Sequence, residues 1–182
     1  MAGRDLEFRR KQGVVVVLSL AAAGAVVLLG MRARALFAGA LPEADDLATR
    51  LAFALRWLLA PGALLLAGIV NVGRRGFYAD AIDGTRTPAN RGLEIGIRYN
   101  LNTLEQCLLV AIAWPALAVS VSHAQLAFIP AMACLFVAGR LAFWIGYLLH
   151  PTARAFGMTM TVLPTVVAYA WLGIHWLGRV VP

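Results

Sequence analysis

The sequence has little charge for its length of 182 residues. Only 14% of its residues are charged and 61% are hydrophobic, whereas an ordinary soluble domain is about 25% charged and about 45–50% apolar. The mean hydropathy is +0.77. This composition excludes an ordinary soluble domain and indicates an integral membrane protein, with room for four or five spans of ~20 residues each.

Cysteine and histidine are also scarce. The two cysteines, Cys107 and Cys134, both fall within apolar segments. They form neither a disulfide framework nor a CxxC redox or zinc motif, and we interpret both as small buried hydrophobic residues. The histidines, His123, His150 and His175, lie in three different segments without metal-ligand spacing, so we expect no metal site.

Three sequence patterns that mark other protein classes are absent. No stretch alternates with period two, so the chain is not a membrane β-barrel. No basic run is interleaved with aromatic residues, and the net charge of +7 therefore does not indicate a nucleic-acid partner. No internal repeat is present, which disfavours a small transporter built from paired repeats.

Five apolar segments are present, and each is near membrane-spanning length. They cover Gly13–Met31, Leu51–Val72, Leu101–Val121, Ala124–Leu149 and Gly157–Leu177. Because only a helix satisfies the backbone hydrogen bonds of a single span in lipid, each segment is predicted to be helical. The expected fold class is all-α, a multi-pass transmembrane helix bundle.

The basic residues orient this bundle. The N-terminal tail, the connection Arg74–Arg98 and the turn at Arg154 would all lie at one end, where arginines are concentrated. Because basic loops usually remain inside, we expect the N-terminus and the Arg74–Arg98 loop to be cytoplasmic. The first segment could instead be a secretory signal peptide, but its length and the presence of Asp5 and Glu7 in its leading tail favour a retained helix.

The start of the third segment carries an unusual polar face. Arg98, Asn102 and Glu105 are spaced four and then three residues apart, so they share one side of a helix. Ionisable groups at membrane depth are costly and usually have either a partner or a function. Further candidates at the same predicted end come from three other segments: Arg74, Arg75, Arg140, Phe143, Tyr147 and Arg154.

These side chains would form an arginine-rich pocket with one inward carboxylate, Glu105. Guanidinium groups suit carboxylates and thiolates, and a carboxylate suits an ammonium group, so glutathione would fit. Structural alternatives remain open. Glu105 and Arg140 could form an interhelical ion pair, and Arg74, Arg75 and Arg98 could be membrane-surface anchors. Arg50 and Arg56 are expected to extend to the outer membrane surface.

Three segments, taken in order, resemble the MAPEG family, the group of membrane glutathione transferases, leukotriene-C and prostaglandin-E synthases and the lipoxygenase-activating protein. The matching residues are Arg98-x-x-x-Asn102-x-x-Glu105, Gly139-Arg140-x-x-Phe143-x-x-Gly146-Tyr147, and Arg154. Arg74-Arg75-Gly76-Phe77 also looks like the basic end of that family's first helix. The resemblance covers roughly residues 51–177.

The resemblance implies a four-helix transmembrane domain over residues 47–182, assembled as a homotrimer in the membrane lipids. Residues 1–46 would add a tail, one extra transmembrane helix and an acidic loop. Glutathione, the co-substrate, would lie between adjacent subunits near the cytoplasmic end, and a lipophilic small-molecule substrate would enter from the bilayer.

The resemblance also implies residue roles. Glutathione would be held by Arg98, Asn102, Glu105, Arg140 and Tyr147, and Arg154 would stabilise its thiolate in catalysis. Arg74, Arg75 and Phe143 would lie on the side of the second substrate. Gln106 and Phe143 depart from residues found in some members. The implied activity is that of a glutathione transferase or peroxidase, and the alternative is a non-catalytic lipid-binding or scaffold protein of the same fold.

Overall fold

A computed structural model describes the backbone of residues 2–180 and the side chains of residue 10 and residues 12–179. Five long helices account for most of this part, and each is long and apolar enough to cross a membrane. Their bounds are α1 Ala2–Arg32, α2 Leu47–Gly73, α3 Arg91–Ser120, α4 Phe128–Leu149 and α5 Arg154–Val180. The predicted all-α transmembrane bundle is confirmed.

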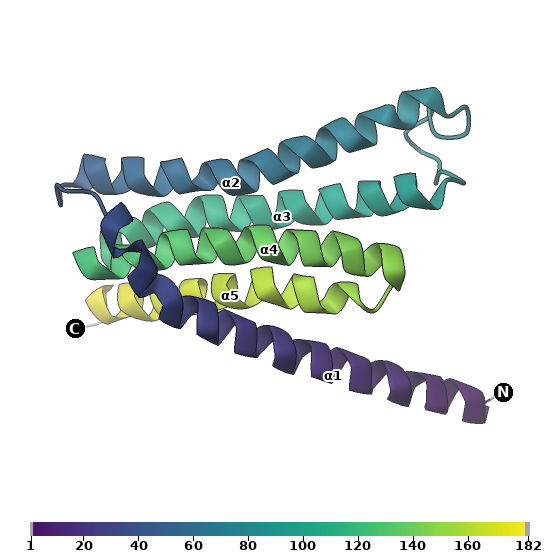
Figure 1. The fold of residues 1–182 in the computed structure, drawn as a ribbon, viewed down its shortest axis with the longest axis horizontal. Helices are drawn as coiled ribbons and strands as arrows, with labels where there is room; N and C mark the ends of the chain where they lie inside the picture. Colours follow the sequence, from purple (N-terminus) through teal and green to yellow (C-terminus); the bar gives the residue numbers. More distant parts are fainter. Residues whose placement is uncertain (1, 181–182) are drawn as a thin grey trace.

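Helices α2 to α5 lie side by side and alternate in direction, and α1 crosses the bundle at an angle (Figure 1). The closest pairs are α2 with α3 and α4 with α5, while α1 packs mainly on α5. The inward side of α1 is formed by Ala23 and Val27, which are buried. Ala23 packs against Leu135 of α4 and Met160 of α5. The extra helix is therefore an outer layer on a four-helix core.

The core of the four-helix bundle contains large side chains, which lie from the middle of the helices toward the α3–α4 turn. Trp114 of α3 meets Phe136 of α4 edge to face, with ring centroids 6.5 Å apart. Phe53 of α2 and Ile129 of α4 belong to the same buried cluster. Such aromatic pairs favour one relative rotation of neighbouring helices. This rotation also decides which side chains point inward toward the end at which α5 begins.

Helix α3 begins ten residues before the apolar segment that was predicted to start at Leu101. The side-chain oxygen of Asn90 accepts a hydrogen bond from the backbone N–H of Leu93 at 3.0 Å. This N-cap satisfies one of the free donors at the helix start. The predicted loop Arg74–Arg98 is thus shorter, and Arg98 lies on the same helix as Asn102 and Glu105, as their spacing predicted.

Helices α4 and α5 approach unusually closely because small residues face each other. A Cβ atom on Gly157 of α5 would overlap the backbone of α4 at Phe143 and Gly139. A Cβ on Gly146 would lie 2.7 Å from the carbonyl oxygen of Ala153. Small residues commonly allow such close packing between membrane helices. This contact sets the start of α5 directly beside the last turns of α4.

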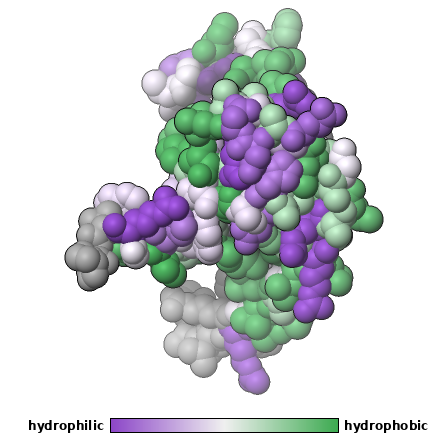
Figure 2. All heavy atoms as spheres, turned by 90° about the vertical axis from the view of Figure 1, so that its left-hand side faces the viewer, coloured by the Kyte–Doolittle hydropathy of each residue, from purple (hydrophilic) through white to green (hydrophobic). Residues whose placement is uncertain are grey.

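The tail of α1, the α2–α3 connection and the α4–α5 turn lie at one end of the molecule, as predicted (Figure 1). The opposite end, seen in Figure 2, carries hydrophilic side chains surrounded by apolar flanks. The prediction that Arg50 extends to the outer surface is wrong, because its side chain at this end is largely covered. Its guanidinium donates to Asp45 at 2.6 Å and to the carbonyl oxygens of Ala118 and Val121 at 3.0 and 2.7 Å.

The cysteines only partly match the prediction that both are buried. Cys107 is half-buried, and its Sγ lies 3.4 Å from the carbonyl oxygen of Pro61 on α2. Cys134 is exposed on the surface of α4, because it faces away from the helices that cover the other side of α4. Pro61 itself is buried inside α2 and does not end the helix.

Candidate functional site

Arg140, on the inward face of α4, is the centre of the polar site. Its side chain is 0% exposed. Nη1 donates to Oδ1 of Asn102 on α3 at 2.7 Å, and Nη2 donates to the hydroxyl of Thr161 on α5 at 3.0 Å. Its Nε is buried without a partner. Three helices therefore meet at one guanidinium, which has only neutral acceptors among the described residues.

Asn102 connects this buried cation to a carboxylate on the surface. Its Nδ2 donates to Oε2 of Glu105 at 3.3 Å, while its Oδ1 accepts from Arg140. The ion pair between Glu105 and Arg140 that the sequence left open is therefore not formed. The two charges are joined through one amide instead.

Glu105 does not point inward, as was predicted, but is exposed on α3. The inner side of α3 at this depth is occupied by the contact of Asn102 with Arg140, and Glu105 lies three residues further around the helix. It stands near the middle of a 30-residue span. A carboxylate at membrane depth is costly, and among the described residues Asn102 is the group that hydrogen bonds to it.

A stack of two aromatic rings between two arginines leads from Arg140 to the end of the bundle. The Arg140 guanidinium carbon lies 4.6 Å from the ring centroid of Phe143. Phe143 meets Tyr147 edge to face at 5.9 Å, and the guanidinium of Arg154 lies 4.6 Å from the ring centroid of Tyr147. Cation–π contacts of this kind hold guanidinium groups in place without neutralising them.

Three further predicted site residues, Arg98, Arg75 and Arg74, lie at the same end but outside this stack. Arg98 is exposed and pairs with Glu94 on its own helix at 2.9 Å. Nε of Arg75 donates to the carbonyl oxygen of Ala81 at 3.0 Å, and Arg74 is exposed. Phe143 is buried beneath Arg140, so a single chain does not present it to a second substrate.

Sequence reasoning missed two residues of the site. Thr161 and Met158 of α5 both contact the Arg140 guanidinium, with Met158 Sδ at 3.9 Å from Nη2. Thr161 lies seven residues after Arg154, two turns along the same helix face, and this spacing was the available signal. Gln106 was noted only as a departure from the family pattern, yet its Oε1 is buried without a partner.

Comparison with known proteins gives one match. No curated protein and no solved structure matches the chain. Within the described residues, no group of three or more histidine, cysteine or acidic side chains could hold a metal ion. The model of the MAPEG family matches residues 51–174, which include α3, α4 and most of α2 and α5. This match shows that the chain belongs to the MAPEG family.

Proposed function

We propose that the protein is a membrane glutathione transferase or peroxidase that acts on lipophilic electrophiles or hydroperoxides. Membership of the MAPEG family supports an activity of this class. The observation that carries the proposal is the state of Arg140. It is a fully buried cation with neutral oxygen acceptors, and one of its donors is unpartnered.

A buried charge without a counter-ion is expensive to maintain. Its cost is more easily explained if an anionic group binds nearby during function. A carboxylate of glutathione would supply that charge, and Arg98 could leave its exposed pair with Glu94 to assist. The exposed Glu105, bonded to Asn102, would pair with the ammonium group of the same ligand.

The exposed position of Glu105 supports assembly of the site between subunits, as a homotrimer. The same outer face of α3 carries exposed leucines, including Leu101, Leu104 and Leu108. A face that combines one carboxylate with apolar residues is poorly suited to lipid alone, since charged groups at membrane depth are usually covered by protein. A second subunit packed here would enclose glutathione next to Glu105 and Asn102.

Arg154 would act on the sulfur. It begins α5, where the helix dipole favours negative charge, and its side chain donates no hydrogen bond within the described part of the chain, so its five N–H donors are available. Next to this cation the glutathione thiol would release its proton to water at the mouth of the site. The thiolate would then form a C–S bond with an electrophilic carbon and expel its leaving group.

With a hydroperoxide, the thiolate would attack the terminal oxygen and break the O–O bond. The alkoxide would take up a proton to give an alcohol, and the sulfenic acid of glutathione would react with a second glutathione to give the disulfide and water. Tyr147 holds Arg154 from one side through its ring. It thereby positions the guanidinium for either reaction.

The test is glutathione binding to the purified protein in detergent, measured by isothermal titration. Glu105→Gln keeps the shape of the side chain but removes the charge that would pair with the ammonium group. Affinity should fall by ~2–5 kcal/mol, the usual effect of breaking a desolvated charge pair. Glu43→Gln, which removes the same charge in the α1–α2 connection, serves as the control and should leave binding unchanged.

Equal binding by wild type and a folded, normally assembled Glu105→Gln variant would assign Glu105 to structure alone. If wild type binds glutathione but turns over neither chlorodinitrobenzene nor a lipid hydroperoxide, the proposed chemistry fails. A non-catalytic binding role would then replace it.

A further inference from the structure

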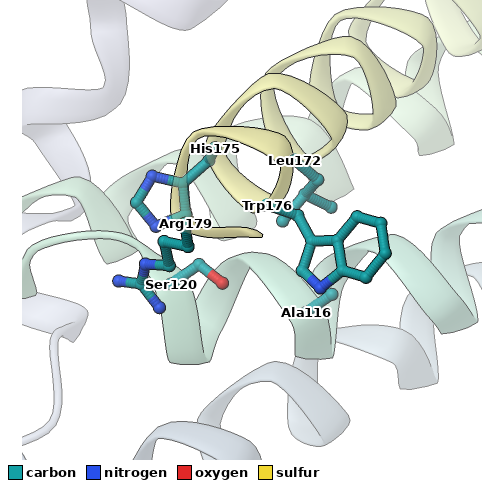
Figure 3. A pocket seen from close by; sticks show the side chains of 6 residues that line it. All are labelled: Ala116, Ser120, Leu172, His175, Trp176 and Arg179. Atoms are coloured by element: carbon teal, nitrogen blue, oxygen red, sulfur yellow. The ribbon is translucent and has the colours of Figure 1, made fainter. Parts of the chain in front are cut away.

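A polar cavity lies at the end of the bundle opposite Arg154, between α3 and α5. Its volume is about 260 Å³. Figure 3 shows its lining, which comes from the last turns of the two helices: Ala116, Ser120, Leu172, His175, Trp176 and Arg179. One part of this lining is apolar, and the other part carries a hydroxyl, an imidazole and a guanidinium.

The polar groups of this cavity lack partners within the described part of the chain. Nε2 of His175 is buried without a hydrogen-bond partner. The imidazole ring is fixed by stacking on Trp171, with centroids 4.7 Å apart and planes 12° from parallel. Arg179 is exposed and makes no ion pair with a described side chain. The Ser120 hydroxyl, the His175 imidazole and the Arg179 guanidinium thus line one cavity without hydrogen bonding to one another.

Arg179 is a cation at this end that no described carboxylate pairs with. Both α3 and α5 end here, and the partial negative charge of helix C-termini opposes an anion, so a bound anion would depend on the full charge of Arg179. Arg50 already donates to the carbonyl oxygens of Ala118 and Val121 at the end of α3. The acidic Asp45 is held by Arg50 and by His123 rather than by Arg179. Arg179 is thus left to interact with a ligand.

The α3–α5 groove is defined here as this polar cavity together with an apolar cavity nearer the middle of the bundle. A second cavity of about 490 Å³ lies between the same two helices, lined mostly by apolar atoms of residues that include Leu109, Val166 and Tyr169. The polar cavity includes Ser120 and the second includes Gln106. These two residues are ~21 Å apart along a helix with a rise of ~1.5 Å per residue. The hydrocarbon layer of one leaflet is ~15 Å thick, so an acyl chain fits this length.

We propose that the α3–α5 groove binds an anionic phospholipid. Its phosphate would accept hydrogen bonds from Arg179, His175 and the Ser120 hydroxyl, and one acyl chain would run past Ala116 toward Gln106. Trp176, which is amphipathic and lies at the mouth, suits the boundary between headgroup and hydrocarbon. This site is separate from the proposed glutathione site and does not depend on it.

The experiment uses the full-length protein, purified in detergent in its assembled form. Phosphatidylglycerol, phosphatidylcholine and inorganic phosphate are titrated separately, and bound lipid is counted by native mass spectrometry. Phosphatidylglycerol should bind at least tenfold more tightly than phosphatidylcholine. Arg179→Gln should weaken phosphatidylglycerol binding about ten- to a hundredfold, the usual effect of losing one charge-assisted hydrogen bond.

Arg56→Gln is the matched control, because Arg56 is an exposed arginine on α2 that lines neither cavity. It should leave phosphatidylglycerol binding unchanged. Ala116→Phe, which fills the apolar part of the cavity, should weaken lipid binding without removing a charge. Both Arg179→Gln and Ala116→Phe should keep the wild-type helical circular dichroism spectrum and thermal unfolding midpoint, which shows that they fold.

Several results would overturn the proposal. Inorganic phosphate binding as tightly as phosphatidylglycerol would show an anion site with no role for the chain. Equal effects of Arg179→Gln and Arg56→Gln would show general attraction to the basic protein. The absence of any bound lipid in the assembled protein would show that the groove is not a lipid site.

Discussion

Arg140 shows how one residue can organise three helices at the cost of a buried charge. Its guanidinium is satisfied by one amide oxygen and one hydroxyl rather than by a carboxylate. Neutral acceptors stabilise a cation less than an ion pair does, but they leave its charge available to a ligand. The rings of Phe143 and Phe136 lie 4.6 and 5.9 Å from the guanidinium carbon and offset part of the cost.

At the other end of the bundle, Asp45 has a clearly structural role. It accepts hydrogen bonds from Arg50 at 2.6 Å and pairs with His123 at 3.0 Å, so it ties the α1–α2 connection to the α3–α4 turn. The hydrogen bond from Arg50, followed by that from His123, lowers the pKa of Asp45 to about 2. An unfolded aspartate has a pKa of about 3.9.

Because the folded pKa is the lower one, Asp45 stabilises the fold fully above pH ~4 and loses this effect as the pH falls toward 2. Asp45→Asn should therefore make the thermal unfolding midpoint less dependent on pH between 4 and 2. Circular dichroism of the detergent-solubilised protein measures this midpoint. Glu43→Gln is the control, and a slope in Asp45→Asn as steep as in this control would contradict the assignment.

At the scale of helices, the α4–α5 contact decides whether the site forms. The small residues Gly139, Gly146 and Gly157 bring the two backbones together. As a result, Thr161 reaches Arg140, and Arg154 reaches Tyr147. A wider spacing would separate the two arginines from the partners that hold them.

Gly157→Ala should destabilise the protein by about 1–3 kcal/mol, the range for overpacking a tight interface. The added methyl group would overlap the backbone of α4, which cannot move without disturbing Arg140. Gly173→Ala on the same helix meets nothing within 4 Å and should be neutral or slightly stabilising. Unfolding by titration with a denaturing detergent compares the two, and similar stability of both variants would argue against this packing.

The helices were predictable because hydrophobic segments of membrane length leave few other folds. The start of α3 was missed because an apolar segment marks only the lipid-facing part of a helix, although Asn90 was a readable N-cap. The outward orientation of the Glu105 side chain could not be predicted from residue spacing. Asn102 lies on the same helix face, and it is Asn102 that contacts Arg140. The cavity at Arg179 could not be predicted from the sequence, because Ser120 and His175 line it together only once α3 packs on α5.

At the scale of the whole molecule, the position of the connections supports one orientation. The α2–α3 connection and the start of α5 lie at the same end as the start of α1 (Figure 1), and these two segments contain Arg86 and Arg154. The positive-inside rule predicts that this end is cytoplasmic. The proposed glutathione site would then open toward the compartment in which glutathione is abundant, and the proposed lipid site toward the other leaflet.

Single cysteines at positions 86 and 154, placed in a chain whose Cys107 and Cys134 are replaced by alanine, test this orientation. Both should react with a membrane-impermeant maleimide only when the cytoplasmic side is accessible. A cysteine at position 43, in the α1–α2 connection, should react only from the other side. Labelling of positions 86 and 154 from opposite faces would contradict the five-helix topology.

The central claim is that Arg154 stabilises the thiolate of bound glutathione. The most direct measurement is the ultraviolet difference band of the thiolate, recorded as a function of pH in wild type and Arg154→Ala. Wild type should show the band at neutral pH. In Arg154→Ala the apparent pKa of bound glutathione should rise because the stabilising cation is gone, and turnover should fall about a hundred- to a thousandfold while binding persists. Arg154→Lys should recover part of both effects, since it keeps the charge without the fork of donors. An identical thiolate titration in wild type and Arg154→Ala, both saturated with glutathione, would contradict the account.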